Sequence, residues 1–584
     1  MNKNSFFLAI SFLVLLTNLR AQDLYVGIDS SGNTTNLTPD LSYYYDYTYI
    51  GYNSEASNNS LVNPGAVFNN SQDISIGYFG SANSLIVSNA GFLQVSGSGY
   101  IGNQETSSNN LMLIKNTSEK GVQSEGDFNG DLNIGYSGSG NGAIISDGGL
   151  MLVNGDTFLG HQTTSSNNFL SIEQGPDSGF TFNGDLNVGY AGSGNSLVVS
   201  NAGGCVSYNG ALNIGYLDTS SNNSMIVTGV LGSYTSIAAF LNNDINLGYS
   251  GSSNSVIVSN GGRLIAVNCY IGNQNNSSNN YLLINGISYN GLSSTLFLSG
   301  DMTLGYGGSG NTLIISNGGQ LFDSNGWISY TNEASNNTLL VAGSNSLWTN
   351  AGSLTIGSTN SSGTLIISDN AQVRATNIFV QNGLLSFNAT SPVGSSTVTL
   401  GASNSTNTPL LLITTNATID TLNYHTNGQL VVSEATEQIL TINGALTLEN
   451  GINSQVYFTL LDQSPLNNHT INLLKYATNS NSSLTTNNFT VANLEGVTIQ
   501  FVESSGFITV QATANYCGEI TLTNSLTVSN YTVACGYLNI ASNGILTATN
   551  VTVESPGTLK GDGVINIEGG DLNIYGTFAP NVGN

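Results

Sequence analysis

The sequence predicts an all-β protein that folds as a right-handed parallel β-helix of roughly 20 coils, and three observations support this fold class. The segment DLNIGYSGSGNGAIISDGGLML, from Asp131 to Leu152, recurs along the chain. A sister segment, YIGNQETSSNNLMLI from Tyr100 to Ile114, alternates with it. Outside the N-terminus no window places apolar residues at helical spacing, whereas short runs of Ile, Leu and Val lie between Gly, Asn, Ser and Asp.

Each segment type keeps a glycine at one position, and the two types together repeat every 24 to 33 residues or so, about the period of a solenoid. In the first type this glycine is Gly77, Gly135, Gly189, Gly248, Gly305 and Gly357. In the second type it is Gly51, Gly102, Gly160, Gly215 and Gly272, with Ser329 in the glycine position. One repeat is too short to bury its own apolar face, so it becomes stable when neighbouring repeats stack on it.

Alternation within the apolar runs indicates short strands with one buried face. Leu132 and Ile134 point one way, and Asp131 and Asn133 point the other. Strands stacked at about 4.8 Å would hydrogen-bond along the axis of the coil stack. We expect residues 24–584 to build a rod on the order of 100 Å long if all the coils stack.

The chain begins with a predicted signal peptide over residues 1–21. Lys3 precedes an apolar run from Phe6 to Leu16, and the small residue Ala21 is a suitable cleavage point. The run is too short to cross a bilayer, and no later segment is apolar enough to do so. The alternative is a buried core helix, but the order of charged, apolar and small residues favours export.

Four regions follow the predicted signal peptide. Residues 22–48, which are rich in tyrosine, are expected to cap the open end of the stack. Residues 49–383 form the regular array of two alternating coil types. In residues 384–516 the spacing loosens, which predicts larger, less regular coils or a β-rich insert. Residues 517–584 return to a tighter array of β-helix coils.

Two segments resemble a known group of proteins. VAGSNSLWTNAGSLTIGSTNSSGTLIISDNAQV, from Val341 to Val373, resembles the short repeats of bacterial type V secretion (autotransporter) passengers and PEP-CTERM-associated proteins. SPGTLKGDGVINIEGGDLNIYGTFAPNVGN, from Ser555 to Asn584, resembles the end of an autotransporter passenger. The resemblance covers about residues 49–380 and implies a secreted β-helix with an adhesive role at the cell surface, the outer membrane or outside the cell. No translocator strands follow, so we expect either a fragment or another export route.

Composition narrows the choice of partners. The 584 residues include 8 Lys and Arg, 34 Asp and Glu and 70 Gly, which gives a net charge of −26 although only 7% of residues are charged. Such a chain fits a repetitive extracellular β-protein, and its apolar residues are patterned, unlike those of a disordered chain. The basic residues are scattered, so we expect no nucleic acid partner. A membrane would be reached only through a translocator or anchor that this sequence lacks.

Two polar sets accompany the glycines. The first lies four residues before the glycine and contains Asp73, Asp131, Asp185, Asp244 and Asp301. A Ca²⁺ ladder is one interpretation, but coils of one type lie about 9 to 10 Å apart, so two carboxylates cannot share an ion and we expect turn residues. The second set is expected to form two stacked amide columns inside turns. One column is Asn83, Asn141, Asn195, Asn254 and Asn311, and the other contains the pairs Asn109, Asn110 and Asn279, Asn280.

Aligned aromatic residues form the candidate binding site. Those that follow the glycine of the first segment type are Tyr78, Tyr136, Tyr190, Tyr249 and Tyr306. Those two residues before the glycine position of the second type are Tyr49, Tyr100, Phe158, Tyr270 and Trp327. Such rings could bind glycans or proteins, and the alternative is ladder packing that supports the turns. From the second set we expect Tyr100 and Tyr270, together with all five of the first, to contact a ligand.

The sequence offers little support for catalysis. The histidines are His161, His425 and His469, and none lies in a motif such as GxSxG or HExxH. We therefore expect no enzyme, no cofactor and no metal site.

The four cysteines form two groups. Cys205 and Cys269 are expected to be isolated core residues, because they fall in different columns of distant coils. Cys517 and Cys535 are each followed by Gly and lie about one short coil apart, which makes a disulfide between them plausible in an exported protein.

Together these features predict an exported structural protein that binds other cells, glycans or copies of itself. Two alternatives stay open. A cleft lined by several convergent acids would favour a β-helical polysaccharide-active enzyme. Smooth faces everywhere would favour an inert spacer.

Overall fold

The computed structural model describes residues 22–116, 121–173, 175, 177–231, 234–240, 242–403, 405–432, 439–449, 455–460, 470–478, 484–492, 497–514, 519–533, 536–555 and 557–580. The predicted signal peptide, residues 1–21, lies outside them. Within the described residues there are strands and turns, one short 3₁₀ turn labelled η2 (Thr486–Asn488), and no α-helix.

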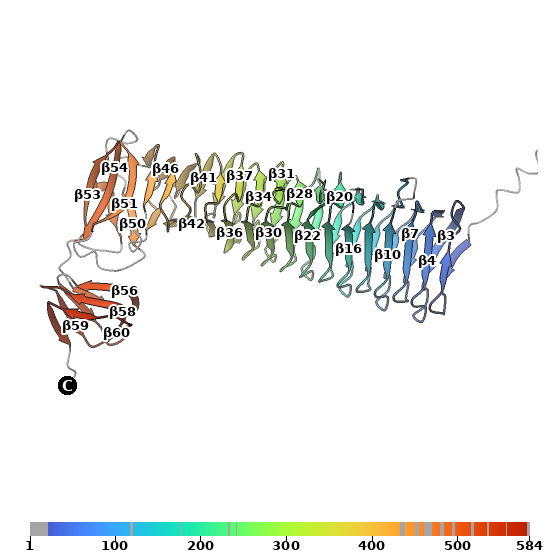
Figure 1. Cartoon of the computed structure of the whole chain (residues 1–584), viewed down its shortest axis with the longest axis horizontal. Helices are drawn as coiled ribbons and strands as arrows, with labels where there is room; N and C mark the ends of the chain where they lie inside the picture. Colours follow the sequence, from blue (N-terminus) through green and yellow to red (C-terminus); the bar gives the residue numbers. More distant parts are fainter. Residues whose placement is uncertain are drawn as a thin grey trace, which may run out of the picture. The chain divides into compact units, whose positions relative to one another are not determined.

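The chain divides into two compact units, unit 1 up to Ala351 and unit 2 from Gly352 onwards. In unit 1, successive coils contribute short strands to three parallel ladders, and the strands of each ladder lie one above another along the stack (Figure 1). The three ladders enclose a continuous core.

The strands of unit 1 are short, and most contain three to five residues. The first ladder contains β2 (Thr34–Asn36), β4 (Ser60–Pro64), β7 (Ser84–Ser88), β10 (Leu111–Lys115), β13 (Gly142–Ser146), β16 (Phe169–Glu173), β19 (Ser196–Ser200), β22 (Ser224–Thr228), β27 (Ser255–Ser259), β30 (Tyr281–Asn285), β33 (Thr312–Ser316) and β36 (Asn337–Ala342). The second ladder contains β3 (Ser42–Ile50), β5 (Val67–Asn70), β8 (Phe92–Val95), β11 (Glu125–Phe128), β14 (Leu150–Val153), β17 (Gly179–Phe182), β20 (Gly204–Ser207), β25 (Ile237–Phe240), β28 (Arg263–Ala266), β31 (Thr295–Leu298), β34 (Gln320–Asp323) and β37 (Leu347–Asn350).

The third ladder contains β1 (Gln22–Val26), the second half of β3, β6 (Ile74–Ile76), β9 (Gly99–Ile101), β12 (Leu132–Ile134), β15 (Thr157–Leu159), β18 (Leu186–Val188), β21 (Leu212–Ile214), β26 (Ile245–Leu247), β29 (Cys269–Ile271), β32 (Met302–Leu304) and β35 (Gly326–Ile328). The long strand β3 joins the second and third ladders, because it pairs with both β5 and β6. A small hairpin, β23 (Val230–Leu231) and β24 (Tyr234–Thr235), projects from one coil.

Strand pairing in unit 1 is parallel and in register from coil to coil. In the first ladder, Met112 of β10 lies opposite Leu85 of β7 on one side and Ala143 of β13 on the other. Alternate residues point inwards, so Leu85 and Val87 are fully buried whereas Ile86 between them lies on the outer face. This pairing and burial confirm the parallel β-helix that the repeats predict.

A column of asparagines, exposed at Asn33 and buried from Asn59 to Asn337, runs through the turns of unit 1. The backbone N–H and the side-chain amide of Asn168 both donate to Oδ1 of Asn195 in the next coil, at 2.9 and 3.0 Å. The same pair of bonds links each successive member of the column. The members are Asn33, Asn59, Asn83, Asn110, Asn141, Asn168, Asn195, Asn223, Asn254, Asn280, Asn311 and Asn337.

The prediction of two separate asparagine columns is therefore wrong. Asn110 and Asn280 of the second segment type stand in the same column as Asn83 and Asn141. The reason is geometric: one Oδ1 can accept from the coil before it only if every coil contributes an asparagine at the same height. Asn109 precedes the column member and has a positive φ of 56°, so it shapes the turn instead.

The glycine column sits against this asparagine column. Gly189 has φ of 72°, and a Cβ built on it would lie 2.2 Å from the side-chain nitrogen of Asn223 in the next coil. A glycine is therefore required there both for its left-handed backbone and for the space that the asparagine occupies. Ser329 takes the glycine position in the coil where the column ends, and its hydroxyl accepts a hydrogen bond from Asn337.

Unit 2 begins with parallel coils of less even length. One ladder contains β39 (Gly363–Ser368), β42 (Gly383–Asn388), β44 (Leu410–Ile413), β47 (Gln429–Val432), β50 (Val456–Leu460) and β52 (Phe489–Val491). Another contains β38 (Ser353–Ile356), β41 (Asn377–Val380), β43 (Thr397–Leu400), β46 (Thr421–Tyr424) and β49 (Leu446–Leu448). The strand β40 (Gln372–Arg374) precedes β41 in the chain.

The remaining strands of unit 2 belong to smaller sheets. The strands β45 (Ala417–Ile419), β48 (Leu440–Ile442) and β51 (Thr470–Ala477) pair in parallel, and β54 (Phe507–Ala514) and β53 (Val497–Ser504) add to them in antiparallel fashion. The last residues form two parallel sheets with a core of their own, built around Leu546 and Val551. These strands are β55 (Glu519–Leu522), β56 (Ser525–Val533), β57 (Tyr537–Ile540), β58 (Ile545–Val553), β59 (Thr558–Gly561), β60 (Val564–Ile567), β61 (Leu572–Ile574) and β62 (Thr577–Pro580).

Candidate interaction surface

Aromatic side chains line the outer side of the third ladder of unit 1. Each coil has an aromatic ring at one or both of two positions, two residues before the column glycine and one residue after it. We call the set the aromatic strip. Its members are Tyr25, Tyr49, Tyr52, Tyr78, Tyr100, Tyr136, Phe158, His161, Tyr190, Tyr216, Tyr249, Tyr270, Tyr306, Trp327 and Tyr330. Ring contacts run from coil to coil, so the strip is a continuous structural feature over several coils at a time.

The rings adopt two arrangements. Tyr190, Tyr216 and Tyr249 stack in parallel, with ring centroids 5.0 and 4.8 Å apart. The faces of stacked rings pack against one another, so the ring edges and hydroxyl groups point outwards. Tyr100 meets Tyr136 at 79°, which turns one of these two rings across the strip.

A row of asparagine side chains runs beside the stacked tyrosines. The amide nitrogens of Asn213, Asn246 and Asn273 each donate to the side-chain oxygen of the preceding asparagine, beginning at Asn187, at 2.8 to 3.0 Å. Asn187, Asn213 and Asn246 each lie two residues before a column glycine. Tyr190, Tyr216 and Tyr249 directly follow the same three glycines. Asn187 and Asn213 are buried and Asn246 and Asn273 are half-buried, so the surface presents tyrosine edges and hydroxyls beside the amides of the last two asparagines.

All seven residues that the sequence singles out for ligand contact belong to the strip. They lie in three groups, with Tyr78 in the first, Tyr100, Tyr136, Tyr190 and Tyr249 in the second, and Tyr270 and Tyr306 in the third. Sequence reasoning missed Tyr52, His161, Tyr216 and Tyr330, which follow the glycine position in coils of the second type. Extending the first column through both coil types would have found them. The ring contacts of these four residues with neighbouring coils also provide the ladder packing that is the alternative to ligand binding.

Burial controls protonation along the strip. It raises the pKa of Tyr49 to about 12, and it raises the pKa of Tyr100, Tyr216 and Tyr270 above the ordinary value. Burial also lowers the pKa of His161, which packs 4.3 Å from Phe158 and lies 2.8 Å from the side-chain oxygen of Asn133. Near neutral pH these four hydroxyls keep their protons and can donate hydrogen bonds, and the imidazole is uncharged.

A column of carboxylates borders the strip. Oδ1 of Asp131 accepts from the backbone N–H of Asp156 at 2.9 Å, and Oδ1 of Asp156 accepts from that of Asp185 at 2.8 Å. Asp73, Asp244 and Asp301 make the same bond to the next coil. These bonds confirm the turn role. Sequence reasoning did not single out Asp156, which lies on the coil between those of Asp131 and Asp185. Burial, and then the charges of Asp185 and Asp131, raise the pKa of the Asp156 carboxyl.

The cysteines of unit 1 are isolated, as expected. Cys205 and Cys269 are free and buried in different ladders, and burial raises the pKa of each thiol to about 12. Cys517 and Cys535, between which a disulfide is predicted, lie outside the described residues.

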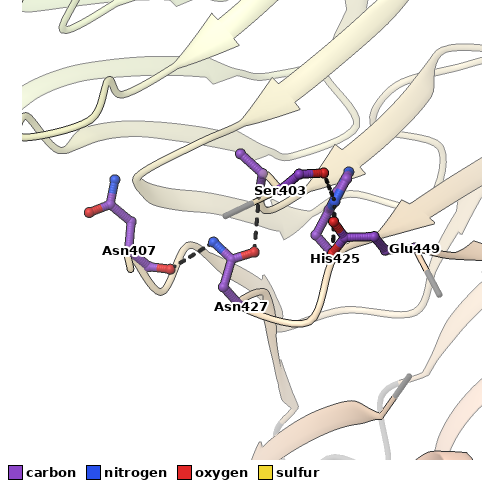
Figure 2. A network of polar contacts seen from close by, with 6 residues as sticks. Ser403, Asn407, His425, Asn427 and Glu449 are labelled. Carbon is purple, nitrogen blue, oxygen red and sulfur yellow. Dashed lines mark hydrogen bonds and ion pairs between the residues drawn. The ribbon is translucent and has the colours of Figure 1, made fainter. Parts of the chain in front are cut away.

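Unit 2 contains the grouping that most resembles a catalytic site. Figure 2 shows Ser403, His425 and Glu449 together, with Asn427 linked to Asn407 beside them. Nδ1 of His425 lies 3.2 Å from Oε2 of Glu449 and 3.5 Å from Oγ of Ser403. Hydrogen bonds from Ser403 and then His425 lower the pKa of Glu449. Because the hydroxyl and the carboxylate meet the same nitrogen, the imidazole cannot pass a proton from one to the other in the manner of a triad.

Other surface features of the described residues are modest. Open hollows of about 230, 290 and 460 Å³ lie beside Thr547, Tyr45 and Asn53. No group of three His, Cys, Asp or Glu side chains that could hold a metal comes together in this part of the chain. No helix within the described ranges is long and apolar enough to cross a membrane. The chain matches no protein-family model and no curated protein sequence.

Proposed function

We propose that this protein is an exported structural scaffold that binds neutral polysaccharide along the aromatic strip of unit 1. The observation that carries the proposal is the strip itself, in which the stacked Tyr190, Tyr216 and Tyr249 lie beside an amide row whose last two members, Asn246 and Asn273, are half-buried. A repeating surface suits a repeating ligand, because the three coils that carry Tyr190, Tyr216 and Tyr249 have the same pair of residues, Asn and Tyr, at these positions. Weak contacts at each coil then add up along the strand.

The charge of the surface favours a neutral ligand. The chain carries a net charge of −26, and the carboxylates of Asp131, Asp156 and Asp185 border the strip on adjacent coils. An acidic polymer would be repelled by this border, and the few basic residues give it no counter-charge. Neutral hexose or N-acetylhexosamine polymers avoid that repulsion and can use both the rings and the amides.

Export and an adhesive role complete the proposal. They are supported by the charge-then-apolar-then-small order of residues 1–21 and by the sequence resemblance to autotransporter passengers. Expression of the full chain in a Gram-negative host tests export: with residues 2–21 present the protein is expected outside the cytoplasm, and without them it is expected inside. Equal distribution of the two forms would contradict export.

For the enzyme alternative, the grouping of Ser403, His425 and Glu449 is the nearest candidate site in the described residues, and its geometry does not support proton relay through two different nitrogens. The spacer alternative predicts that the aromatic strip serves the turns alone. Binding measurements distinguish this spacer alternative from the proposal.

The test compares a strip variant with a matched control. Tyr216→Ala with Tyr249→Ala removes two stacked rings, and Tyr208→Ala removes a tyrosine that is 52% exposed and lies outside the strip. Cellulose, chitin and mannan serve as neutral probes and alginate as the acidic probe in pull-down and affinity electrophoresis. We expect the wild type to bind at least one neutral probe, the double variant to bind it about tenfold more weakly or worse, and the control to bind it normally. Binding to none of the neutral probes, or equal loss in the control, would contradict the proposal.

A further inference from the structure

The outer face of the first ladder carries an unexpected column of aliphatic side chains. In a sheet with one wet face, the central outward position of each strand is normally polar. Here it is half-buried and aliphatic in ten of eleven consecutive strands, and each residue lies in register with the next. We call the column the aliphatic strip. It consists of Val62, Ile86, Leu113, Ile144, Ser171, Val198, Ile226, Ile257, Leu283, Ile314 and Leu340.

The positions that flank this strip are mostly small and uncharged. Serine or threonine occupies many of them, as in β7 (SLIVS) and β27 (SVIVS). The charged side chains among the outward positions of these eleven strands are Lys115 on β10 and Glu173 on β16. In a chain with a net charge of −26, this face is the one on which a second copy can approach with little repulsion.

The two charged residues have a specific relation. Lys115 lies opposite Ser146 of β13, and Ser146 lies opposite Glu173 of β16, so the three occupy one column on three consecutive coils. A two-fold axis that runs along β13, in the plane between two facing sheets, would place β10 of one chain over β16 of the other. Positions along the strand are unchanged by this rotation. Lys115 would then face Glu173 of the partner subunit, and the same pair would form a second time across the axis.

We propose that two copies of this chain associate through their aliphatic strips, with the coil stacks antiparallel and β13 on the two-fold axis. In this register nine strands of each copy overlap, from β2 to β27. At about 4.8 Å per strand and 3.3 Å per residue, the shared area is roughly 650 Å² per copy, or about 1,300 Å² in total, which lies within the range of stable interfaces. The face is apolar along its centre, as the inner faces of packed sheets are. This inference does not depend on polysaccharide binding.

Charge exchange tests the register. Lys115→Glu places two carboxylates against each other on both sides of the two-fold axis, and Glu173→Lys places two ammonium groups there. We expect each single variant to raise the dissociation constant of the dimer about tenfold or more, measured by sedimentation velocity with the full purified chain. The double variant Lys115→Glu, Glu173→Lys is expected to dimerise like the wild type. Mixing the two single variants is expected to give a mixed dimer tighter than either parent.

A second substitution pair tests the surface itself. Ile144→Lys places a charge at the centre of the aliphatic strip, and Ile265→Lys places the same charge on a half-buried outward isoleucine of β28 in the second ladder. Both changes carry the same risk to folding, which circular dichroism monitors. The first variant is expected to be monomeric and the second dimeric. A monomeric wild type at tens of micromolar, equal behaviour of the two isoleucine variants, or no rescue by the double charge exchange would each overturn the proposal.

Discussion

Unit 1 and the first coils of unit 2 use the same parallel coil but hold their turns differently. In unit 1 a buried asparagine accepts two hydrogen bonds from the coil before it in every coil from Asn59 to Asn337. Among the described residues of unit 2, Asn488 is the only buried asparagine, and it ends the 3₁₀ turn η2 instead of standing in a column. Apolar ladders alone therefore suffice to stack coils.

The comparison shows what the asparagine column adds. Each asparagine has to stand at the same height as its neighbours, so the column fixes the length and shape of one turn in every coil. In unit 2, where the column is absent, strand lengths and connections vary, and an antiparallel pair, β53 and β54, joins the parallel strands. We infer that regular coils in unit 1 follow from the polar column and that the apolar core by itself leaves the turns free to vary.

The largest effect is expected from breaking the glycine position. Gly189→Ala puts a methyl group 2.2 Å from the Asn223 amide in a backbone with φ of 72°. The backbone penalty and the displaced asparagine together are expected to lower the free energy of unfolding by about 3 to 4 kcal/mol. Both tryptophans, Trp327 and Trp348, lie in unit 1, so tryptophan fluorescence during urea unfolding reports this unit.

Ser329→Gly is the matched control for this prediction. It makes the reverse change in the same column, at the coil where the asparagine ladder ends with Asn337. We expect a change within about 1 kcal/mol, because the serine loses one hydrogen bond and gains backbone freedom. A large loss in this control, or a small one for Gly189→Ala, would show that the asparagine contact does not set the glycine requirement.

The next effect is expected from the asparagine column itself. Asn195→Leu removes the acceptor for the backbone N–H and the side-chain amide of Asn168, and both donors stay buried. Two unsatisfied donors are expected to cost about 2 to 4 kcal/mol of unit 1 stability in urea unfolding followed by tryptophan fluorescence.

Asn423→Ala in unit 2 provides the comparison. Its amide lies on the outer side of β46, 3.5 Å from Thr399, so its loss is expected to change the stability of unit 2 by less than about 0.5 kcal/mol, measured by circular dichroism. Similar losses for the two substitutions, each in its own unit, would remove the distinction drawn here between the units.

Sequence reasoning predicted the repeating elements well and the surfaces poorly. The fold class follows from the periodic glycines and apolar runs, because each needs only its own coil and the next. The aliphatic strip was not predicted. Alternation within β7 separates Ile86 from Leu85 and Val87, but the pairing of Ile86 with Leu113 is needed to show that the outward aliphatic residues form one column. Likewise, Tyr216 joins the aromatic strip because the two coil types share one frame, which separate alignment of the types conceals.

An effect that appears only as pH rises is expected from a buried acid in unit 1. Oδ2 of Asp323 accepts from Nε1 of Trp348 at 2.9 Å, Oδ1 has no hydrogen-bond partner in the structure, and burial raises the pKa of this carboxyl to about 8. In the unfolded chain its pKa is near 4. The folded state therefore holds a proton that the unfolded state releases between about pH 4 and 8, so stability is full at the acid end and falls as pH rises.

Asp323→Asn keeps an acceptor for Trp348 and removes the titration. The variant is expected to be about 2 to 4 kcal/mol more stable than the wild type at pH 8 and equal to it near pH 4, by urea unfolding at each pH. Asp127→Asn is the control. Burial, and then the charge of Glu125, raises the pKa of Asp127 to about 6. This substitution should therefore flatten the plot of unfolding free energy against pH only below about pH 6. An unchanged slope in Asp323→Asn would place the titration elsewhere.

The smallest effect on stability is expected from the buried thiols, which serve as local reporters of unit 1. Cys205 and Cys269 are buried and carry a pKa of about 12, so labelling by a thiol reagent at neutral pH requires the coil around each of them to open. In a Cys517→Ser, Cys535→Ser background, labelling is expected to be at least about a thousandfold slower than in denaturant. Gly189→Ala lies closer in sequence to Cys205 and is expected to accelerate labelling of Cys205 more than that of Cys269. Equal acceleration of both thiols would mean that unit 1 opens as a whole and that the asparagine column couples all of its coils.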